Sequence, residues 1–158
     1  MTDLMFWTLL LSLLCVFYMI YSTKQRRDFQ ILQTPMRSLT DSMLHEKYPI
    51  LVHDRVEELS SVLRGVFRFQ YLFIKEIRTD TIPEGPRKVG TRFLLLRNRE
   101  GADANLRMGL QEGSMIPMIA NPYNLLILPA GWYFEVDSPA SWELLALNDL
   151  SHRLFFAH

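Results

Sequence analysis

The sequence lacks two things above all: cysteine pairs and an excess of charge of either sign. Cys15 is its single cysteine, so no disulfide framework can form within the chain. Lys plus Arg total 17 and Asp plus Glu total 17, which gives a formal net charge of +0 at pH 7. The sequence has no excess of basic residues that could recruit nucleic acid, and it has no acidic tail. Neither a disordered composition nor an internal repeat is present.

Motifs that carry chemistry are also missing. The sequence contains no glycine-rich phosphate loop, no cysteine-based zinc pattern, no HExxH and no GxSxG. None of the pairs among its histidines shows the spacing typical of zinc or iron ligands. Those histidines are His45, His53, His152 and His158. We therefore expect no catalytic residue, no cofactor-binding residue, no metal ligand and no cofactor.

What the sequence does contain is a long apolar run, Leu4–Tyr21, without proline, glycine or charge. As a helix it spans roughly 27 Å, close to the ~30 Å hydrocarbon core of a bilayer. Its polar side chains Thr8 and Ser12 can bond back to their own helix. Aromatic residues lie near both ends, as at membrane interfaces. The run predicts a membrane anchor, whose marker residues are Leu4, Trp7, Leu11, Cys15, Tyr18 and Tyr21.

Two alternatives to an anchor are a cleaved signal peptide and a buried core helix. A signal peptide begins with basic residues and ends at small ones, whereas this chain has Asp3 before the run and Tyr21-Ser22-Thr23 after it. A core helix is shorter and amphipathic, whereas this run is apolar on every face. The residues Lys24, Arg26 and Arg27 follow the run and set the topology. They predict a single-pass protein whose short N-terminus crosses the membrane and whose remainder lies on the cytosolic side.

The rest of the chain, about 135 residues, suffices for one domain with a hydrophobic core. We expect a membrane anchor over 1–23, a juxtamembrane stalk over 24–33, and a compact β-rich soluble domain over 34–158. Thr34 and Pro35 predict the start of a helix that ends near Lys47. Asp54 and Glu57 predict the start of a second helix that ends near Gly65 and has Val56, Leu59, Val62 and Leu63 as its apolar face.

Strand-length segments separated by turn residues dominate the remainder. They are Tyr48–His53, Phe67–Ile77, Thr91–Arg97, Asn105–Leu110, Met115–Ala120, Tyr123–Leu128, Trp132–Val136 and Trp142–Leu147. Many short strands at this spacing indicate an antiparallel β-sandwich or barrel. The fold class we predict is a transmembrane helix followed by a mainly β domain with two or three N-terminal helices (α+β).

The segment Leu125–Val136 carries the most specific pattern, two apolar strands around a Pro129-x-Gly131-Trp132 corner. It resembles the strand–turn–strand element near the C-terminal side of the JmjC-like branch of the cupin double-stranded β-helix. Tyr48–Val52 is similar to the strand that opens such domains. Pro129 and Gly131 allow a sharp turn, and Trp132 would plug the end of the barrel.

The sequence departs from this family where the family binds iron. The resemblance implies an iron-binding histidine two residues after Trp132, and Phe134 occupies that position. The family's His-x-Asp or His-x-Glu triplet is absent as well, because His53 and Asp54 are adjacent and cannot share one face of a strand. The resemblance therefore implies a degenerate, non-enzymatic cupin-like scaffold.

The layout of one membrane span before a compact β-rich domain is similar to that of membrane-anchored minor capsid proteins of large DNA viruses. This resemblance implies a structural adaptor that links an internal viral membrane to the capsid shell. The expected partners are the lipid bilayer and other structural proteins, capsid proteins foremost, without nucleic acid; a homo-oligomer stays open. The alternative is a membrane-tethered cupin-type metal-dependent enzyme that acts on a small molecule or lipid.

Contact surfaces for a partner are expected at strand edges and aromatic patches. The candidates are Phe67, Phe69, Tyr71 and Leu154-Phe155-Phe156, although each also fits simple core packing. The mixed-charge segment Asn98–Gly113 is interpreted as a solubilising hairpin rather than a binding loop.

Overall fold

The computed structural model describes residues 2–23, 28–59, 62, 75–79, 82, 84–99, 101–138 and 142–148. Within these ranges, the side chains of residues 2–4, 18, 19, 21–23 and 75–79 are left out of the description. Residues 67–74 of the predicted strand Phe67–Ile77 and the predicted contact residues 154–156 lie outside the described residues. The predicted start of the second helix at Asp54 is wrong, because residues 54–58 are not helical, whereas Leu59 and Val62 are. The remaining positions of that helix, 60, 61 and 63–65, are outside the described residues.

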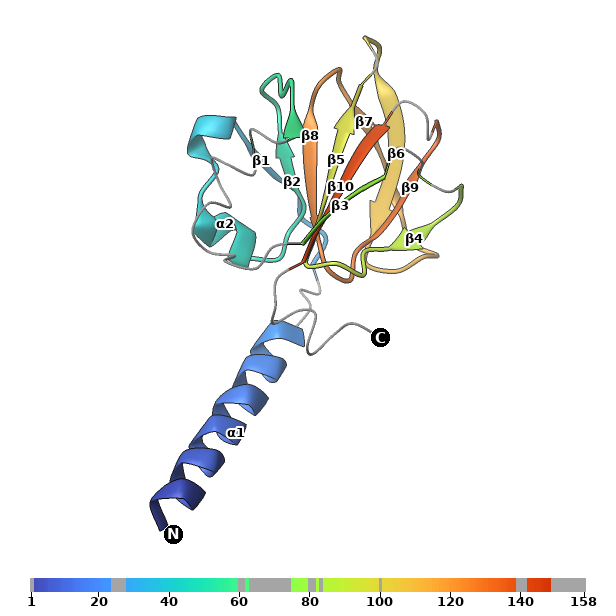
Figure 1. Ribbon diagram of the computed structural model, residues 1–158. Helices are drawn as coiled ribbons and strands as arrows, with labels where there is room; N and C mark the ends of the chain where they lie inside the picture. The colour runs from blue at the N-terminus through green and yellow to red at the C-terminus, as the bar shows by residue number, and fades with distance from the viewer. Residues whose placement is uncertain are drawn as a thin grey trace.

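The first element is helix α1 (Thr2–Thr23), which projects away from the β domain (Figure 1). Thr8 donates its hydroxyl hydrogen to the Met5 carbonyl at 2.9 Å, and Ser12 donates to Leu9 at 2.8 Å, so both polar groups are satisfied within the helix. Among the residues for which both backbone and side chain are described, no helix is long and apolar enough to cross a membrane.

Two sheets form the β domain (Figure 1). The first, the six-stranded sheet, has the order β1 (Leu32–Thr34), β2 (Ile50–Val52), β8 (Leu125–Pro129), β5 (Phe93–Asn98), β10 (Trp142–Asn148), β3 (Lys75–Thr79). The second, the four-stranded sheet, has the order β4 (Arg87–Lys88), β9 (Tyr133–Val136), β6 (Ala104–Gly109), β7 (Ile116–Ala120). Neighbouring strands are antiparallel, except that β1 runs parallel to β2. The mainly β, two-sheet architecture predicted from the strand pattern is confirmed.

The central strand β8 of the six-stranded sheet is buried on both faces, which explains why it is apolar throughout. In β8, Leu126 and Leu128 pack into the core between the two sheets. Leu125 and Ile127 point the other way, into a second core that includes Leu44 of the N-terminal segment. Successive side chains of a strand point to opposite faces, so a strand covered on both sides needs apolar residues at every position.

The N-terminal helical region is shorter than predicted. In place of one helix up to Lys47, the structure has a 3₁₀ turn η1 (Met36–Ser38) and the short helix α2 (Asp41–His45). Leu39 and Thr40 are extended between them, so the chain can follow the sheet while Leu39 and Leu44 remain buried. Pro35 caps η1 and is not the first residue of an α-helix. Packing against the sheet overrode the local helix signals.

Two predicted boundaries also differ from the structure. The sheet already begins within the predicted stalk, because Leu32–Thr34 form β1 and pair with Ile50–Val52. Within the segment Asn98–Gly113, the predicted strand Asn105–Leu110 is confirmed as β6, shifted by one residue. Alternating burial along β6, with Leu106 and Met108 inside and Asn105 and Arg107 outside, accounts for this strand.

Candidate functional site

The predicted corner joins the two sheets. It leads from β8 in the six-stranded sheet to β9 in the four-stranded sheet, with Gly131 at φ 89°. Glycine adopts this left-handed backbone without a steric penalty. The Gly131 N–H donates to the Val89 carbonyl at 2.9 Å, and the Val89 N–H donates to the Trp132 carbonyl at 2.7 Å. The Ala130 N–H donates to Arg92 at 3.1 Å. The corner is thus fixed by main-chain hydrogen bonds to the segment that precedes β5.

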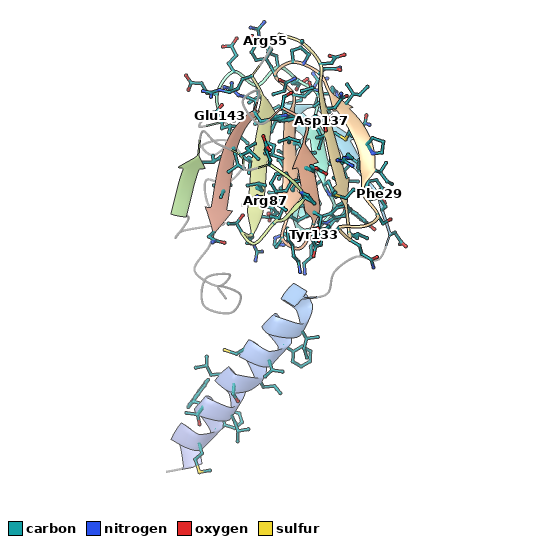
Figure 2. All side chains as sticks on the ribbon, turned by 90° about the vertical axis from the view of Figure 1, so that its right-hand side faces the viewer. Phe29, Arg55, Arg87, Tyr133, Asp137 and Glu143 are labelled. Atoms are coloured by element: carbon teal, nitrogen blue, oxygen red, sulfur yellow. The ribbon has the colours of Figure 1, made fainter. Side chains whose placement is uncertain are left out.

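Trp132 fastens the N-terminal segment to this corner. Its side chain is 1% exposed, and its indole N–H donates to the Lys47 carbonyl at 3.2 Å. The ring of Phe29 packs edge-on against it, with the ring centroids 5.6 Å apart. Figure 2 shows Phe29 and Tyr133 at the end of the domain nearest α1, whereas Arg55 lies at the opposite end. The part of the domain that follows α1 is therefore anchored on Trp132.

The interior between the sheets is apolar around Phe134. Phe134 is 4% exposed and lies opposite Met108 in the β6–β9 ladder. Both side chains belong to the core, together with Leu106 and Trp132. Among the described residues, no group of three or more His, Cys, Asp or Glu side chains could hold a metal ion. This part of the interior offers hydrocarbon packing and no set of metal ligands.

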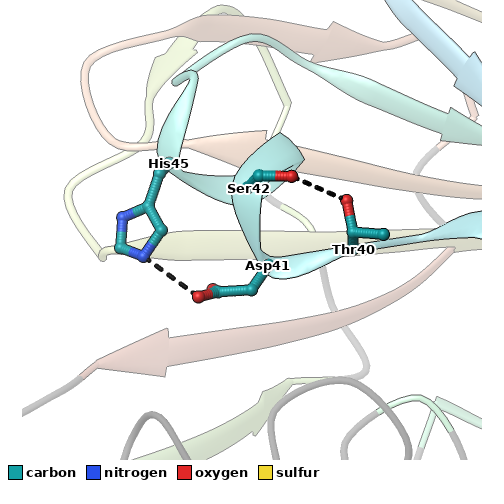
Figure 3. Close-up of polar contacts among 4 residues, drawn as sticks. All are labelled: Thr40, Asp41, Ser42 and His45. Carbon is teal, nitrogen blue, oxygen red and sulfur yellow. Dashed lines mark hydrogen bonds and ion pairs between the residues drawn. The ribbon is translucent and has the colours of Figure 1, made fainter.

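A serine, a histidine and an aspartate meet on α2, but not in a catalytic order (Figure 3). The His45 imidazole lies 3.3 Å from the Asp41 carboxylate, and both side chains are exposed. The hydroxyl of Ser42 pairs instead with that of Thr40, at 2.9 Å. A nucleophilic serine needs a base within hydrogen-bond reach, and the structure gives Ser42 no hydrogen bond to His45. His53 is exposed, and His152 and His158 lie outside the described residues.

A polar cluster at the end opposite α1 fixes the loop after β2. Arg97 and Glu143, on neighbouring strands, form an ion pair with Nη2 and Oε2 2.5 Å apart. Arg97 also donates through Nη1 to the Val56 carbonyl at 3.1 Å. The guanidinium of Arg55 lies 4.4 Å from the ring centroid of Tyr123, a residue with φ 64°. The arrangement holds a loop in place and presents an arginine stacked on an aromatic ring.

The predicted anchor residues lie on α1. Trp7 and Leu11 are 63% and 65% exposed, and Cys15 is half-buried. The side chains of Leu4, Tyr18 and Tyr21, and the residues Lys24, Arg26 and Arg27, are not among those described. The membrane anchor and its orientation stay predictions.

The sequence prediction missed an apolar surface on β7. Ile116 and Ile119 are 46% and 60% exposed, and in the described part of the β domain they are the only exposed large hydrophobic residues. The predicted contact residues Phe67, Phe69, Tyr71 and 154–156 all lie outside the described residues. The sequence does contain one signal for an edge strand here, Pro117 within a strand-length run, because proline in a sheet is confined to edge strands and strand starts.

Comparisons with known proteins give only distant structural similarity. No protein-family model and no curated protein matches the sequence. A TDP-quinovose 3,4-ketoisomerase from Campylobacter jejuni matches over 52% of this chain and 65% of its own, with 11% identity and a TM-score of 0.34. RmlC from Streptococcus suis, in complex with dTDP-D-xylose, matches over 58% and 54%, with 13% identity and a TM-score of 0.35.

The CENP-C cupin domain of Drosophila melanogaster matches over 51% of this chain and 62% of its own, with 10% identity and a TM-score of 0.31. In each of these three comparisons the match spans less than two thirds of the known structure. Each similarity is distant and covers only part of this chain. TM-scores of 0.31 to 0.35 carry no conclusion about family, substrate or partner.

Proposed function

We propose that this protein is a non-enzymatic structural adaptor in which α1 anchors the β domain to a lipid bilayer. The observation that carries the proposal is the exposure of α1. Its exposed large apolar side chains, among them Trp7, Leu11 and Phe17, are 52% to 68% exposed. Monomeric soluble proteins rarely leave so large a contiguous apolar surface uncovered.

The dimensions and energetics of α1 fit a bilayer. Its 22 residues correspond to about 33 Å of helix, and a bilayer core is ~30 Å thick. Burying one large aliphatic side chain contributes about 1.5–3 kcal/mol, so the many apolar residues of α1 together outweigh the cost of immobilising the chain. Thr8 and Ser12 add little cost, because both are already hydrogen-bonded within the helix.

The proposed orientation follows from the sequence after α1. Lys24, Arg26 and Arg27 favour the cytosolic side, so the β domain would lie there as part of a single-pass protein. An internal membrane of a virus derived from a cytoplasmic organelle has its capsid-facing side in the same topological position. We include in the proposal that the chain is a minor capsid protein, with capsid proteins as partners.

The apolar interior supports an adaptor over the alternative, a cupin-type metal-dependent enzyme acting on a small molecule or lipid. Phe134 and Met108 fill the core at the position where the resembled family binds iron. A 2-His-1-carboxylate centre needs three polar ligands around open positions. No observation in the described chain favours the enzyme.

Protease protection of the full chain, synthesised in the presence of microsomes, tests the proposed orientation. We expect added protease to degrade the β domain while a fragment containing α1 stays with the membrane. A matched variant, Lys24→Glu/Arg26→Glu/Arg27→Glu, should shift a measurable fraction of chains to the opposite orientation, because the basic flank sets the topology. A wild-type β domain protected inside sealed vesicles would contradict the orientation.

Crosslinks to a major shell protein in purified particles would support the capsid role, and their absence there would reject it.

A further inference from the structure

The strand β7 is an open edge of the four-stranded sheet. Among the described residues it is the last strand in the sheet order, and there it pairs with β6 on one side only. Its exposed side chains Ile116 and Ile119 lie on either side of Pro117. An exposed edge strand with apolar side chains is a ready template for another strand.

The register shows which main-chain groups point outward. The Asp137 N–H donates to the Asn105 carbonyl at 3.3 Å, so the main-chain groups of Asn105 face β9 and not β7. Ile119 is paired opposite Asn105, and in an antiparallel ladder such a pair directs its polar groups away from each other. The N–H and C=O of Ile119 therefore face the open edge, and so does the C=O of Pro117, two residues earlier.

Acidic residues lie at both ends of this edge. Glu112 is exposed in the turn between β6 and β7. Asp103 is exposed and directly precedes Ala104, which pairs with Ala120 at the other end of β7. The loop of Asp103 also contains Arg99 and Glu100, so by sequence each end carries one net negative charge. Arg107, opposite Pro117, is paired with Glu135 at 2.7 Å.

We propose that β7 receives an extended segment of a protein partner, with an apolar centre and a basic residue at each end. A residue opposite Ile119 would exchange two main-chain hydrogen bonds with it, and a neighbouring N–H would donate to Pro117. The apolar centre covers Ile119, and the basic ends meet Asp103 and Glu112. This inference rests on the proposed adaptor function, for which it names the kind of partner.

Charge disfavours a second copy of this chain as the occupant. Antiparallel pairing of two β7 strands would bring the Glu112 end of one copy to the Asp103 end of the other. Parallel pairing would bring each acid to its own counterpart. Both arrangements place like charges together, which weakens association. A basic partner is instead attracted electrostatically at both ends of β7.

Peptide binding to the full chain in neutral detergent micelles tests the proposal. The probe is a labelled peptide, acetyl-Lys-Thr-Val-Ile-Val-Thr-Lys-amide, followed by fluorescence anisotropy. We expect it to bind about tenfold more tightly than the same peptide with both lysines replaced by glutamates, because two attractive charge pairs become repulsive. A third peptide, N-methylated at its central isoleucine, should lose binding because it can neither donate to nor approach Ile119.

Variants of the protein separate this edge from other surfaces. Ile119→Thr retains a β-branched residue and should weaken the binding of the basic peptide severalfold. Asp103→Asn/Glu112→Gln should make the protein bind the basic and the acidic peptide equally well. Unchanged thermal unfolding of both variants shows that the fold is retained.

The proposal is overturned if the basic peptide does not bind, if both variants bind it as the wild type does, or if β7 instead mediates a dimer that Ile119→Thr disrupts. Because the experiment is done in micelles, its failure leaves the membrane anchor untouched.

Discussion

At the scale of single residues, Trp132 joins the corner between the sheets to the N-terminal segment. It is buried at the corner between the sheets, bonded to the Lys47 carbonyl and packed on Phe29. Its position at the turn could be predicted, because Pro129 and Gly131 define a turn wherever they occur at this spacing. Its contacts with Phe29 and Lys47 could not, because they join parts of the chain far apart in sequence.

We predict that Trp132→Ala lowers the free energy of unfolding of the β domain by about 3–5 kcal/mol, the usual cost of removing a buried tryptophan. The matched control is Trp7→Ala on α1. Trp7 is 63% exposed and has its ring contact with Phe6 of the same helix, so this change should stay within about 0.5 kcal/mol. Urea unfolding in micelles, followed by circular dichroism, measures both values. Equal losses for the two variants would mean that α1 and the domain unfold as one unit.

The ion pair between Arg97 and Glu143 gives a second prediction. The two side chains are 12% and 22% exposed, so each is costly to leave without its partner. Arg97→Leu should destabilise the domain by about 2 kcal/mol, partly because it also releases the Val56 carbonyl. The double variant Arg97→Leu/Glu143→Leu should recover about half of that loss. A double-mutant cycle measures the coupling, and strictly additive effects would show that the pair contributes nothing.

At the scale of elements, the strands and the long helix α1 were predictable, and the short helices after Pro35 were not. Segments such as Trp142–Leu147 and Thr91–Arg97 became β10 and β5 with small shifts, since apolar runs bounded by turn residues are strong local signals. The region after Pro35 carries helix signals that are just as clear, yet it forms only η1 and α2. In this region the path of the backbone depends on the sheet face that the segment covers. The pattern of a single sequence does not show where that face lies.

The open edge of β7 yields a prediction at the same scale. The amide hydrogen of Ile119 points into solvent, whereas that of Met118 lies in the hydrogen-bonded pair with Leu106. We expect Ile119 to exchange its amide hydrogen at least about 100-fold faster than Met118, because only the latter needs an opening of the sheet. Hydrogen exchange followed by NMR measures both rates in one sample. Equal protection would mean that this edge is already covered.

At the scale of the whole molecule, the chain consists of two parts with opposite solvent preferences. In the part of the β domain that the structure describes, the exposed large apolar side chains are those on β7, whereas most described apolar side chains of α1 are exposed. The sequence run Leu4–Tyr21 indicated this division, and the basic flank after it indicated the orientation. The adaptor proposal needs both parts: α1 to hold the protein at a bilayer and the domain to present a binding surface.

Flotation of the full chain with neutral phosphatidylcholine vesicles in alkaline carbonate tests the central claim most directly. We predict that the wild type and Leu11→Ile float with the lipid. Leu11→Arg should shift to the lipid-free fraction, since an arginine at the centre of such a helix costs about 2.5–3.5 kcal/mol. A wild-type chain that stays in the lipid-free fraction, with its β domain folded, would contradict the account.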